Sequence, residues 1–362
     1  MKKPGWEVSR NTDPYLLRFY FDFIMTETIR ISREEMKNTF VSILSSIGFA
    51  ERQADDCAEV FTANSVDGVY THGVNRFPVF VQFVKEGFVD KDAAPSLQAA
   101  FHGIEQWNGN LGPGPLNAIS STDRAVHLAK QYGVGCVALA NTNHWMRGGY
   151  YGWQAAEKGC VLIAWTNTTA NMPAWGAVDS KLGNNPLVIA LPFGEEAIVL
   201  DAAMSQYSFG AMEQAAAKGE QLHMNGGFDK NGNVTTDPAA IIESGRPMPI
   251  GYWKGAGLSL LLDILAAILS GGLATHGVSQ LPKEHSVSQV FVCIDLTKLP
   301  NHSMIAKTIA GIIDDYHLSK TESGDKPVRY PGEGVLHRRK ENLENGIPVL
   351  KSTWDQILNL KA

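Results

Sequence analysis

The spacing of apolar residues changes once along this chain of 362 residues, and this change constrains the fold most strongly. Between residues 32 and 87 apolar side chains recur every three or four positions, a period that predicts amphipathic helices near 32–44, 51–64 and 79–86. After about residue 101, short apolar runs typical of strands alternate with helical segments. The chain is therefore expected to be an α/β protein with a helical part and a separate sheet.

The second part can be divided into elements by its apolar runs and turn residues. We expect strands at 133–140, 161–165, 187–191, 197–201 and 289–294, and helices at 115–132, 151–158, 209–218, 255–270 and 303–316. The helix at 255–270 is apolar nearly all round, which predicts that it is buried. Asp263 within it argues against a membrane span.

The bulk composition excludes several classes of function. The chain is 44% apolar and 19% charged, with a formal net charge of −6, so it is a poor partner for nucleic acid or anionic membranes. Its four cysteines are scattered without a C-x-x-C pair, which indicates reduced core residues of a cytoplasmic protein. The apolar segment at 15–25 is too short to span a membrane and no cleavage site follows it, so no secretory signal is expected.

His72 and Arg76 form the first candidate site, within the segment Asp67–Pro78. If a helix begins near Gly73, a spacing of four residues puts the imidazole and the guanidinium on one face. Histidine can transfer a proton near neutral pH and arginine can bind a carboxylate through two hydrogen bonds, which suits redox chemistry beside a carboxylate. The alternative is that both side chains only satisfy polar groups near a turn.

A second histidine and arginine, His144 and Arg147, follow the strand expected at 133–140. Loops after strands commonly carry catalytic groups, so His144 could contact a substrate or a nicotinamide. A structural histidine bonded to a carbonyl is the alternative. The polar loop at 166–171 is where we expect partners for substrate hydroxyl groups.

No G-x-G-x-x-G motif follows an expected strand and opens a helix; the nearest candidate, at 112–114, lacks the third glycine. A nicotinamide enzyme of this sequence would therefore bind its cofactor without a Rossmann turn. Asp229 starts a segment that resembles a calcium loop, but Val234 replaces the required glycine, so we expect a polar turn. No histidines have metal-ligand spacing, and no metal is expected.

Several long segments are similar to one known family. They are DGVYTHGVNRFP (67–78), IEQW (104–107), NHWMRGGYYGWQAAEKG (143–159), NNPLVIALP (184–192), GYWKGAG (251–257) and PGE (331–333). From about residue 29 to the C-terminus the chain resembles the malate/L-lactate dehydrogenase family, whose members lack a Rossmann fold. Residues 1–28 have no counterpart there; we expect residues 1–24 to be dispensable, with Met25 as an alternative start.

The resemblance implies roles for individual residues. His72 matches the acid/base histidine, Arg76 the substrate-carboxylate arginine and His144 a second active-site histidine. The implied cofactor contacts are Ala197, Ile198, Val199, Leu200, Asp201, Ala202, Ala203, Trp253, Lys254, Gly332, Glu333 and Gly334. Thr71 stands where the family usually has serine, and the turn at 193–196 is one residue longer, which shifts the cofactor assignment by up to one position.

The resemblance also implies an architecture and a reaction. We expect a mixed, largely antiparallel sheet domain at 106–289 that binds the cofactor, and a mainly helical domain from 29–105 and 290–362. The expected enzyme is a homodimer that uses NADH to reduce the C2 carbonyl of a sugar-derived 2-keto acid. Alternatives are a dehydrogenase of malate, lactate or ureidoglycolate, or a non-catalytic sugar-acid binding protein.

Overall fold

The computed structural model describes residues 27–321 and 327–361, so the expectations for residues 1–24 and Met25 lie outside the described residues. Its centre is a seven-stranded sheet. In spatial order the strands are β2 (Ser96–Phe101), β3 (Ile104–Asn108), β4 (Val134–Thr142), β12 (Val287–Asp295), β5 (Cys160–Thr166), β8 (Leu187–Phe193) and β9 (Glu196–Ala202). Only β3 and β4 pair in parallel within this sheet, so the expected mixed, largely antiparallel sheet is confirmed.

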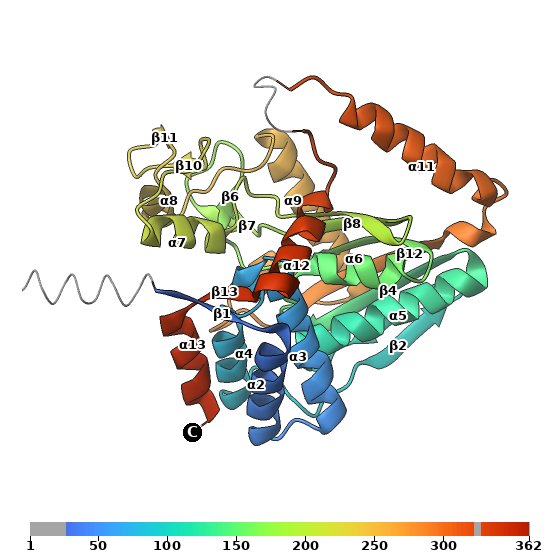
Figure 1. Cartoon of the computed structure of the whole chain (residues 1–362), viewed down its shortest axis with the longest axis horizontal. Helices are drawn as coiled ribbons and strands as arrows, with labels where there is room; N and C mark the ends of the chain where they lie inside the picture. Colours follow the sequence, from blue (N-terminus) through green and yellow to red (C-terminus); the bar gives the residue numbers. More distant parts are fainter. Residues whose placement is uncertain (1–26, 322–326, 362) are drawn as a thin grey trace, which may run out of the picture.

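Helices cover both faces of this sheet (Figure 1). The helices α5 (Gly114–Tyr132) and α6 (Gly148–Ala156) pack on one face, where Phe291 of β12 points. The helix α9 (Trp253–Ser270) packs on the other face, where the neighbouring Val290 points. Successive residues of a strand face opposite sides, so β12 contributes to both cores.

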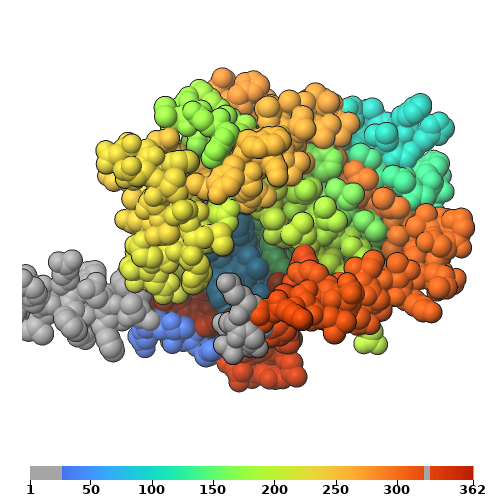
Figure 2. Space-filling view, turned by 90° about the horizontal axis from the view of Figure 1, so that it is seen from above, coloured from blue at the N-terminus to red at the C-terminus, as the bar shows by residue number. Residues whose placement is uncertain are grey.

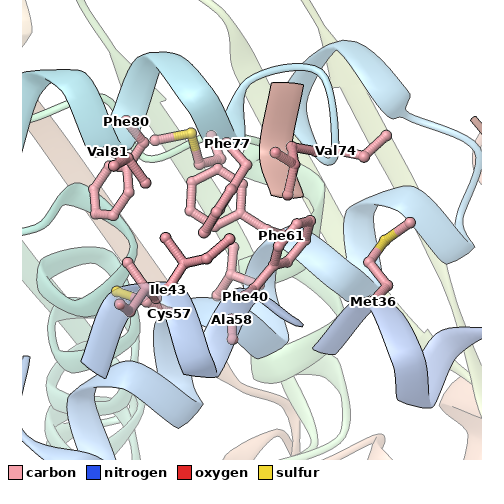
Figure 3. Close-up of a cluster of buried hydrophobic side chains, with 14 of the residues drawn as sticks. Met36, Phe40, Ile43, Cys57, Ala58, Phe61, Val74, Phe77, Phe80 and Val81 are labelled. Atoms are coloured by element: carbon pink, nitrogen blue, oxygen red, sulfur yellow. The ribbon is translucent and has the colours of Figure 1, made fainter. Parts of the chain in front are cut away.

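Both ends of the chain build the helical body. The helices α2 (Arg33–Ser46), α3 (Glu51–Val66), α4 (Phe77–Lys85) and α13 (Lys351–Leu358) share one apolar core, and β1 (Thr28–Ile31) pairs with β13 (Ile347–Leu350) beside them. At the centre, Phe40 stacks on Phe77 with ring centroids 4.0 Å apart, and Phe61 meets Phe77 edge-on (Figure 3). Such aromatic packing fixes the start of α4 relative to α2 and α3.

A small lobe stands beside the sheet. It consists of α7 (Phe209–Ala217), α8 (Pro238–Ser244) and the short hairpin β10 (Gly227–Phe228) and β11 (Val234–Thr235), around a core of its own. Figure 2 shows a hollow between this yellow lobe and the green and orange parts of the molecule, with blue residues from the N-terminal part of the chain at its floor. The other elements are η1 (Tyr70–His72), β6 (Met172–Pro173), β7 (Ser180–Leu182), α10 (Thr275–Val278), η2 (Leu296–Lys298), α11 (His302–His317), α12 (Glu333–Asn345) and η3 (Asn359–Lys361).

The prediction that the helix at 255–270 is buried was wrong. One side of α9 packs on the sheet, but six apolar side chains on the rest of the helix are between 38% and 64% exposed: Leu258, Leu260, Leu261, Ile264, Leu265 and Ile268. By length and composition α9 could cross a membrane, yet Asp263 accepts hydrogen bonds from Asn167 and from the backbone of Thr275.

The expected domain boundaries at residues 105 and 289 remain our proposal. The strands of the large sheet come from 96–202 and from 287–295. The helical body draws on 28–89 and 347–360, with Met146 inserted into its core from the sheet side.

Candidate active site

His72 is held by the end of α3. The chain leaves this helix through Gly68, whose φ of 80° suits glycine, and makes one 3₁₀ turn at Tyr70–His72. The Asn64 side chain donates to the carbonyl of His72 at 3.0 Å, and the backbone N–H of Val74 donates to Ser65 Oγ at 2.8 Å. Buried polar groups of α3 therefore fix the backbone on both sides of the imidazole.

Arg76 stands at the first turn of α4, which begins at Phe77 and not near Gly73. Pro78 lacks an N–H and is suited to a first helical turn, whereas Gly73 has a φ of −116° and a ψ of −121°. His72 and Arg76 are thus presented from two successive turns, not from one helical face. Phe77 stacks on Phe40 in the helical core, which fixes the backbone position of the preceding residue, Arg76, and so limits where its guanidinium can lie.

His144 lies in the loop after β4, with its ring nearly parallel to that of His72 at a centroid distance of 5.6 Å. Met146 adopts a φ of 69°, rare for a non-glycine residue, and its N–H donates to His144 Nδ1 at 3.0 Å. A nitrogen that accepts this bond carries no proton, so the neutral imidazole has its hydrogen on Nε2. His144 can therefore donate one hydrogen bond from a fixed ring.

The surroundings hold both imidazoles largely neutral. Burial is the first cause that lowers the pKa of His72; Arg76 and Arg147 add to it, while the charge of Asp201 acts in the opposite direction. Burial, Arg76 and His72 put the pKa of His144 well below its ordinary value. The charge of Asp201 raises the pKa of His72 but does not contribute to that of His144. His72 is therefore the histidine better able to take up a proton.

A small pocket adjoins these groups. Its polar lining is Arg76, Asn143, His144 and Glu284, and its apolar lining comes from α4, Val89 and Met146. The loop at 166–171 reaches the pocket through Glu284, which accepts from the backbone of Thr169 at 3.0 Å. The hydroxyl of Thr166 and the amide of Asn167 are bonded to neighbouring protein groups, so this loop offers fewer free polar partners than expected.

The segments predicted to bind the cofactor lie near each other. Residues 196–202 form β9, the edge strand of the sheet, and Val199 N donates to the carbonyl of Pro331 at 3.0 Å. Gly332 has a φ of 96° and lies so close to Val199 that a Cβ would be 3.1 Å from its nitrogen. Directly after β9, the carbonyl of Met204 accepts a hydrogen bond from the backbone N–H of Ile250. This bond holds the segment that precedes Trp253 next to the end of β9.

These residues fit a dinucleotide. The Trp253 ring is 64% exposed at the first turn of α9, next to the cation Lys254, which makes no ion pair within the described residues. In the described part of the chain no side chain caps that helix start, where the N-cap residue Tyr252 has a φ of 61°. A helix N-terminus and a cation suit phosphate. Along β9, the side chains of Ala197 and Val199 are buried in the core. The side chains of Ile198 and Leu200 lie on the opposite, less buried face of the strand, where a cofactor could contact them.

The sequence matches the family model described as "Malate/L-lactate dehydrogenase" over residues 31–358. The 2,3-diketo-L-gulonate reductase of Citrobacter koseri is 41% identical over 330 residues, which cover 91% of this chain and 99% of that protein. The chain belongs to the malate/L-lactate dehydrogenase family. It is an oxidoreductase acting on CH–OH groups, and the family implies a nicotinamide cofactor.

Solved structures share its fold. A malate dehydrogenase from Entamoeba histolytica aligns with a TM-score of 0.87 at 24% identity, over 92% of this chain and 97% of that one. A malate dehydrogenase from Pyrococcus horikoshii OT3 aligns with a TM-score of 0.83 at 26% identity, over 92% and 94%. The expected family and the non-Rossmann fold class are thereby confirmed.

Sequence reasoning gave no role to several residues around the site of this dehydrogenase. Glu284 lines the pocket, and Asp67 and Arg339 form an ion pair outside the residues that line it, with Arg339 Nε 2.7 Å from Asp67 Oδ1. Asp201 was expected only as a cofactor contact, yet its charge acts on His72. Of these residues, only Asp67 could have been singled out from the sequence, because it is the first residue of the segment that contains His72.

Proposed function

We propose that this chain reduces 2,3-diketo-L-gulonate to 3-keto-L-gulonate, with NADH as the reductant and the C2 carbonyl as the acceptor. The observation that carries the proposal is that Arg76 and His144 line one pocket while the His72 ring stacks on that of His144. The identity of 41% with a reductase of that name supports the substrate. The preference for NADH rests on the resemblance described above.

In this proposal each group near the pocket has one task. Arg76 binds the substrate carboxylate, which fixes the adjacent C2 carbonyl. His144 donates a hydrogen bond from Nε2, because its Nδ1 already accepts from the backbone of Met146. Protonated His72 transfers its proton to the C2 oxygen as negative charge develops there. A bound reduced nicotinamide supplies the hydride.

We assign proton transfer to His72 and not to His144. A general acid must exist in its protonated form often enough to react, and its pKa should lie near the working pH. Burial, Arg76 and His72 lower the pKa of His144 further than the pKa of His72 is lowered, so protonating His144 is the more costly event. His72 has the opposing charge of Asp201, and its Nδ1 lies 3.1 Å from the Thr71 hydroxyl.

The pH dependence of the reduction should reflect this arrangement. Because protonated His72 is required, activity is present at low pH and is lost as the pH rises through the pKa of His72. In the free enzyme that pKa is lowered, partly by Arg76, so the limb in kcat/KM should lie below about pH 6.5. A bound substrate carboxylate offsets Arg76, so the limb in kcat should lie at higher pH. Profiles in which the kcat limb lies at the same or lower pH would contradict this account.

A panel of 2-keto acids tests the proposed substrate. The purified chain is mixed with NADH and, in turn, with 2,3-diketo-L-gulonate, oxaloacetate, pyruvate and oxalurate, and NADH oxidation is followed. We expect the highest kcat/KM with 2,3-diketo-L-gulonate, and a lower value when NADPH replaces NADH. A higher kcat/KM with pyruvate would favour a lactate dehydrogenase. A higher kcat/KM with oxaloacetate would favour a malate dehydrogenase, the activity for which the two solved relatives are named.

We also propose a cytoplasmic homodimer that buries the exposed apolar stripe of α9, defined above by its six residues. Contiguous exposed apolar surface of this kind commonly marks a protein interface, and a second copy would cover it by two-fold symmetry. The helix starts at Trp253 and Lys254, so such a dimer would lie beside the proposed cofactor site.

Replacing Leu261 and Ile268 with Glu together should convert the dimer to a monomer, because two buried carboxylates per copy cannot be solvated in that interface. The matched control is Leu318→Glu, which changes an apolar residue that is 80% exposed at the end of α11. Light scattering coupled to size exclusion gives the mass of each variant. A monomeric parent protein, or a double variant that stays dimeric, would refute the proposed interface.

A further inference from the structure

A buried carboxylate outside the lining of the active-site pocket binds two arginines. Asp67 lies directly after α3 and only 7% of its side chain is exposed. Arg147 Nη1 donates to Asp67 Oδ2 at 2.5 Å, and Arg339 donates to both oxygens, at 2.7 and 3.1 Å. Each guanidinium carbon also lies 4.9 Å from the ring centre of Trp153. Charge-assisted hydrogen bonds from two planar groups leave the carboxylate little freedom.

A second carboxylate competes for the same cation. Arg147 Nε is 3.8 Å from Asp201 Oδ2, an ion-pair distance that is too long for a hydrogen bond. That oxygen of Asp201 accepts from the backbone N–H of Gly149 at 2.7 Å instead. Arg147 therefore lies between two acidic groups and is bonded to one of them, Asp67.

The second arginine connects this cluster to the far end of the chain. Arg339 belongs to α12, which starts directly after Gly332 beside β9. Three residues further on, the Asn342 amide donates to the carbonyl of Val66 at 2.8 Å. The helix α12 thus runs from the proposed cofactor segment to the residues that precede His72.

We propose that Asp67 is a positioning residue: by binding Arg147 it keeps this cation from closing on Asp201, so that the Asp201 carboxylate stays available to His72. The inference rests on the proposed role of His72. It goes beyond that role because it concerns a residue that does not line the pocket with Arg76 and His144.

The charge of Asp67 is the feature that matters. Only 5% of the Arg147 side chain is exposed, and a buried guanidinium without a bonded anion is strongly unfavourable. Without the Asp67 charge, the carboxylate within reach of Arg147 is Asp201. The charged groups that act on His72 are Asp201, Arg76 and Arg147, and His144 lies beside it as a neutral ring. Closing Arg147 on Asp201 would offset the one negative charge among them.

The test is the substitution Asp67→Asn, which keeps the shape of the side chain and removes its charge. The pKa of His72 is measured by NMR titration of the histidine rings in the free protein, with His72→Gln to assign the signal. We expect the pKa of His72 to fall in Asp67→Asn, and kcat/KM for reduction at neutral pH to fall about three- to tenfold, since one pKa unit corresponds to a tenfold change in the protonated fraction.

The matched control is Asp295→Asn. Asp295 is also a fully buried carboxylate in an ion pair, 2.8 Å from Lys130 at the end of β12, but it does not act on His72. We expect a lower melting temperature in this variant and an unchanged pKa of His72. If Asp67→Asn likewise lowers the melting temperature but leaves the pKa of His72 unchanged or raised, Asp67 only stabilises the fold and the proposal is wrong.

A second pair of variants covers a failure of Asp67→Asn to fold. Arg339→Gln removes one of the two cations, and Asp67→Asn in that background then removes the anion, which leaves the net charge of the cluster as in the parent. The double variant should show a lower pKa of His72 than Arg339→Gln alone; an equal or higher pKa overturns the proposal. Because the titration needs neither substrate nor NADH, it gives its result even if no 2-keto acid is reduced.

Discussion

Replacing His72 with Gln is expected to lower kcat for reduction by about 10²–10⁴, the usual contribution of a positioned general acid. Gln keeps a polar side chain of similar reach but cannot deliver a proton near neutral pH. The loss of activity as the pH rises should disappear in this variant, since no group would remain to titrate. NADH binding, followed by fluorescence, should be retained, because the proposed cofactor segments lie on β9, α9 and α12.

The comparison variant is His144→Gln in the same assay. In our account His144 donates one hydrogen bond, worth about 0.5–1.5 kcal/mol, so its loss should lower kcat/KM about two- to tenfold and leave the pH limb in place. If His144→Gln loses the pH limb and His72→Gln retains it, the two roles have been assigned in reverse.

The substitution Arg76→Lys is expected to lower kcat/KM about ten- to a hundredfold. Lysine keeps the positive charge but loses the two parallel hydrogen bonds that orient a carboxylate. Losing one charge-assisted hydrogen bond to a buried anion costs about 1.5–3 kcal/mol. Steady-state kinetics with the best substrate of the panel measure this loss, and an unchanged kcat/KM would remove Arg76 from the site.

A matched change elsewhere separates this effect from general disturbance. Arg124 also binds a carboxylate with two nitrogens, 2.9 and 2.6 Å from the oxygens of Glu105, on the outer part of the sheet. Arg124→Lys makes the same chemical change there. We expect it to affect the melting temperature but not kcat/KM.

Elements with a clear apolar period could be predicted from the sequence. The helix expected at 115–132 is α5 at 114–132, and the strand expected at 289–294 is β12 at 287–295. The strand β2 was missed because all its residues are at least partly exposed, so no alternation marks it. The helix α12 was missed for a similar reason: it is polar, with Asn342 as its only fully buried residue, and lacks an apolar stripe.

The chemical types of the residues identified the candidate site, but ion pairs between residues far apart in the sequence could not be predicted from them. His72, Arg76 and His144 stand out by type and by their place near turns and strand ends, and the structure brings them together. The ion pair of Asp67 with Arg339 joins residues 272 positions apart, which no spacing rule can reveal. The burial of α9 was mispredicted because one side of a helix has the same apolar sequence pattern whether it packs in the core or stays exposed in the single chain.

The most direct test of the central claim is a label-transfer experiment. NADH that carries deuterium at the transferred position is incubated with the purified chain and 2,3-diketo-L-gulonate, and the product is examined by NMR and mass spectrometry. Our account predicts 3-keto-L-gulonate with one deuterium bonded to C2. A product without deuterium, or with deuterium at C3, would contradict hydride transfer to the carbonyl that Arg76 is proposed to fix beside His72.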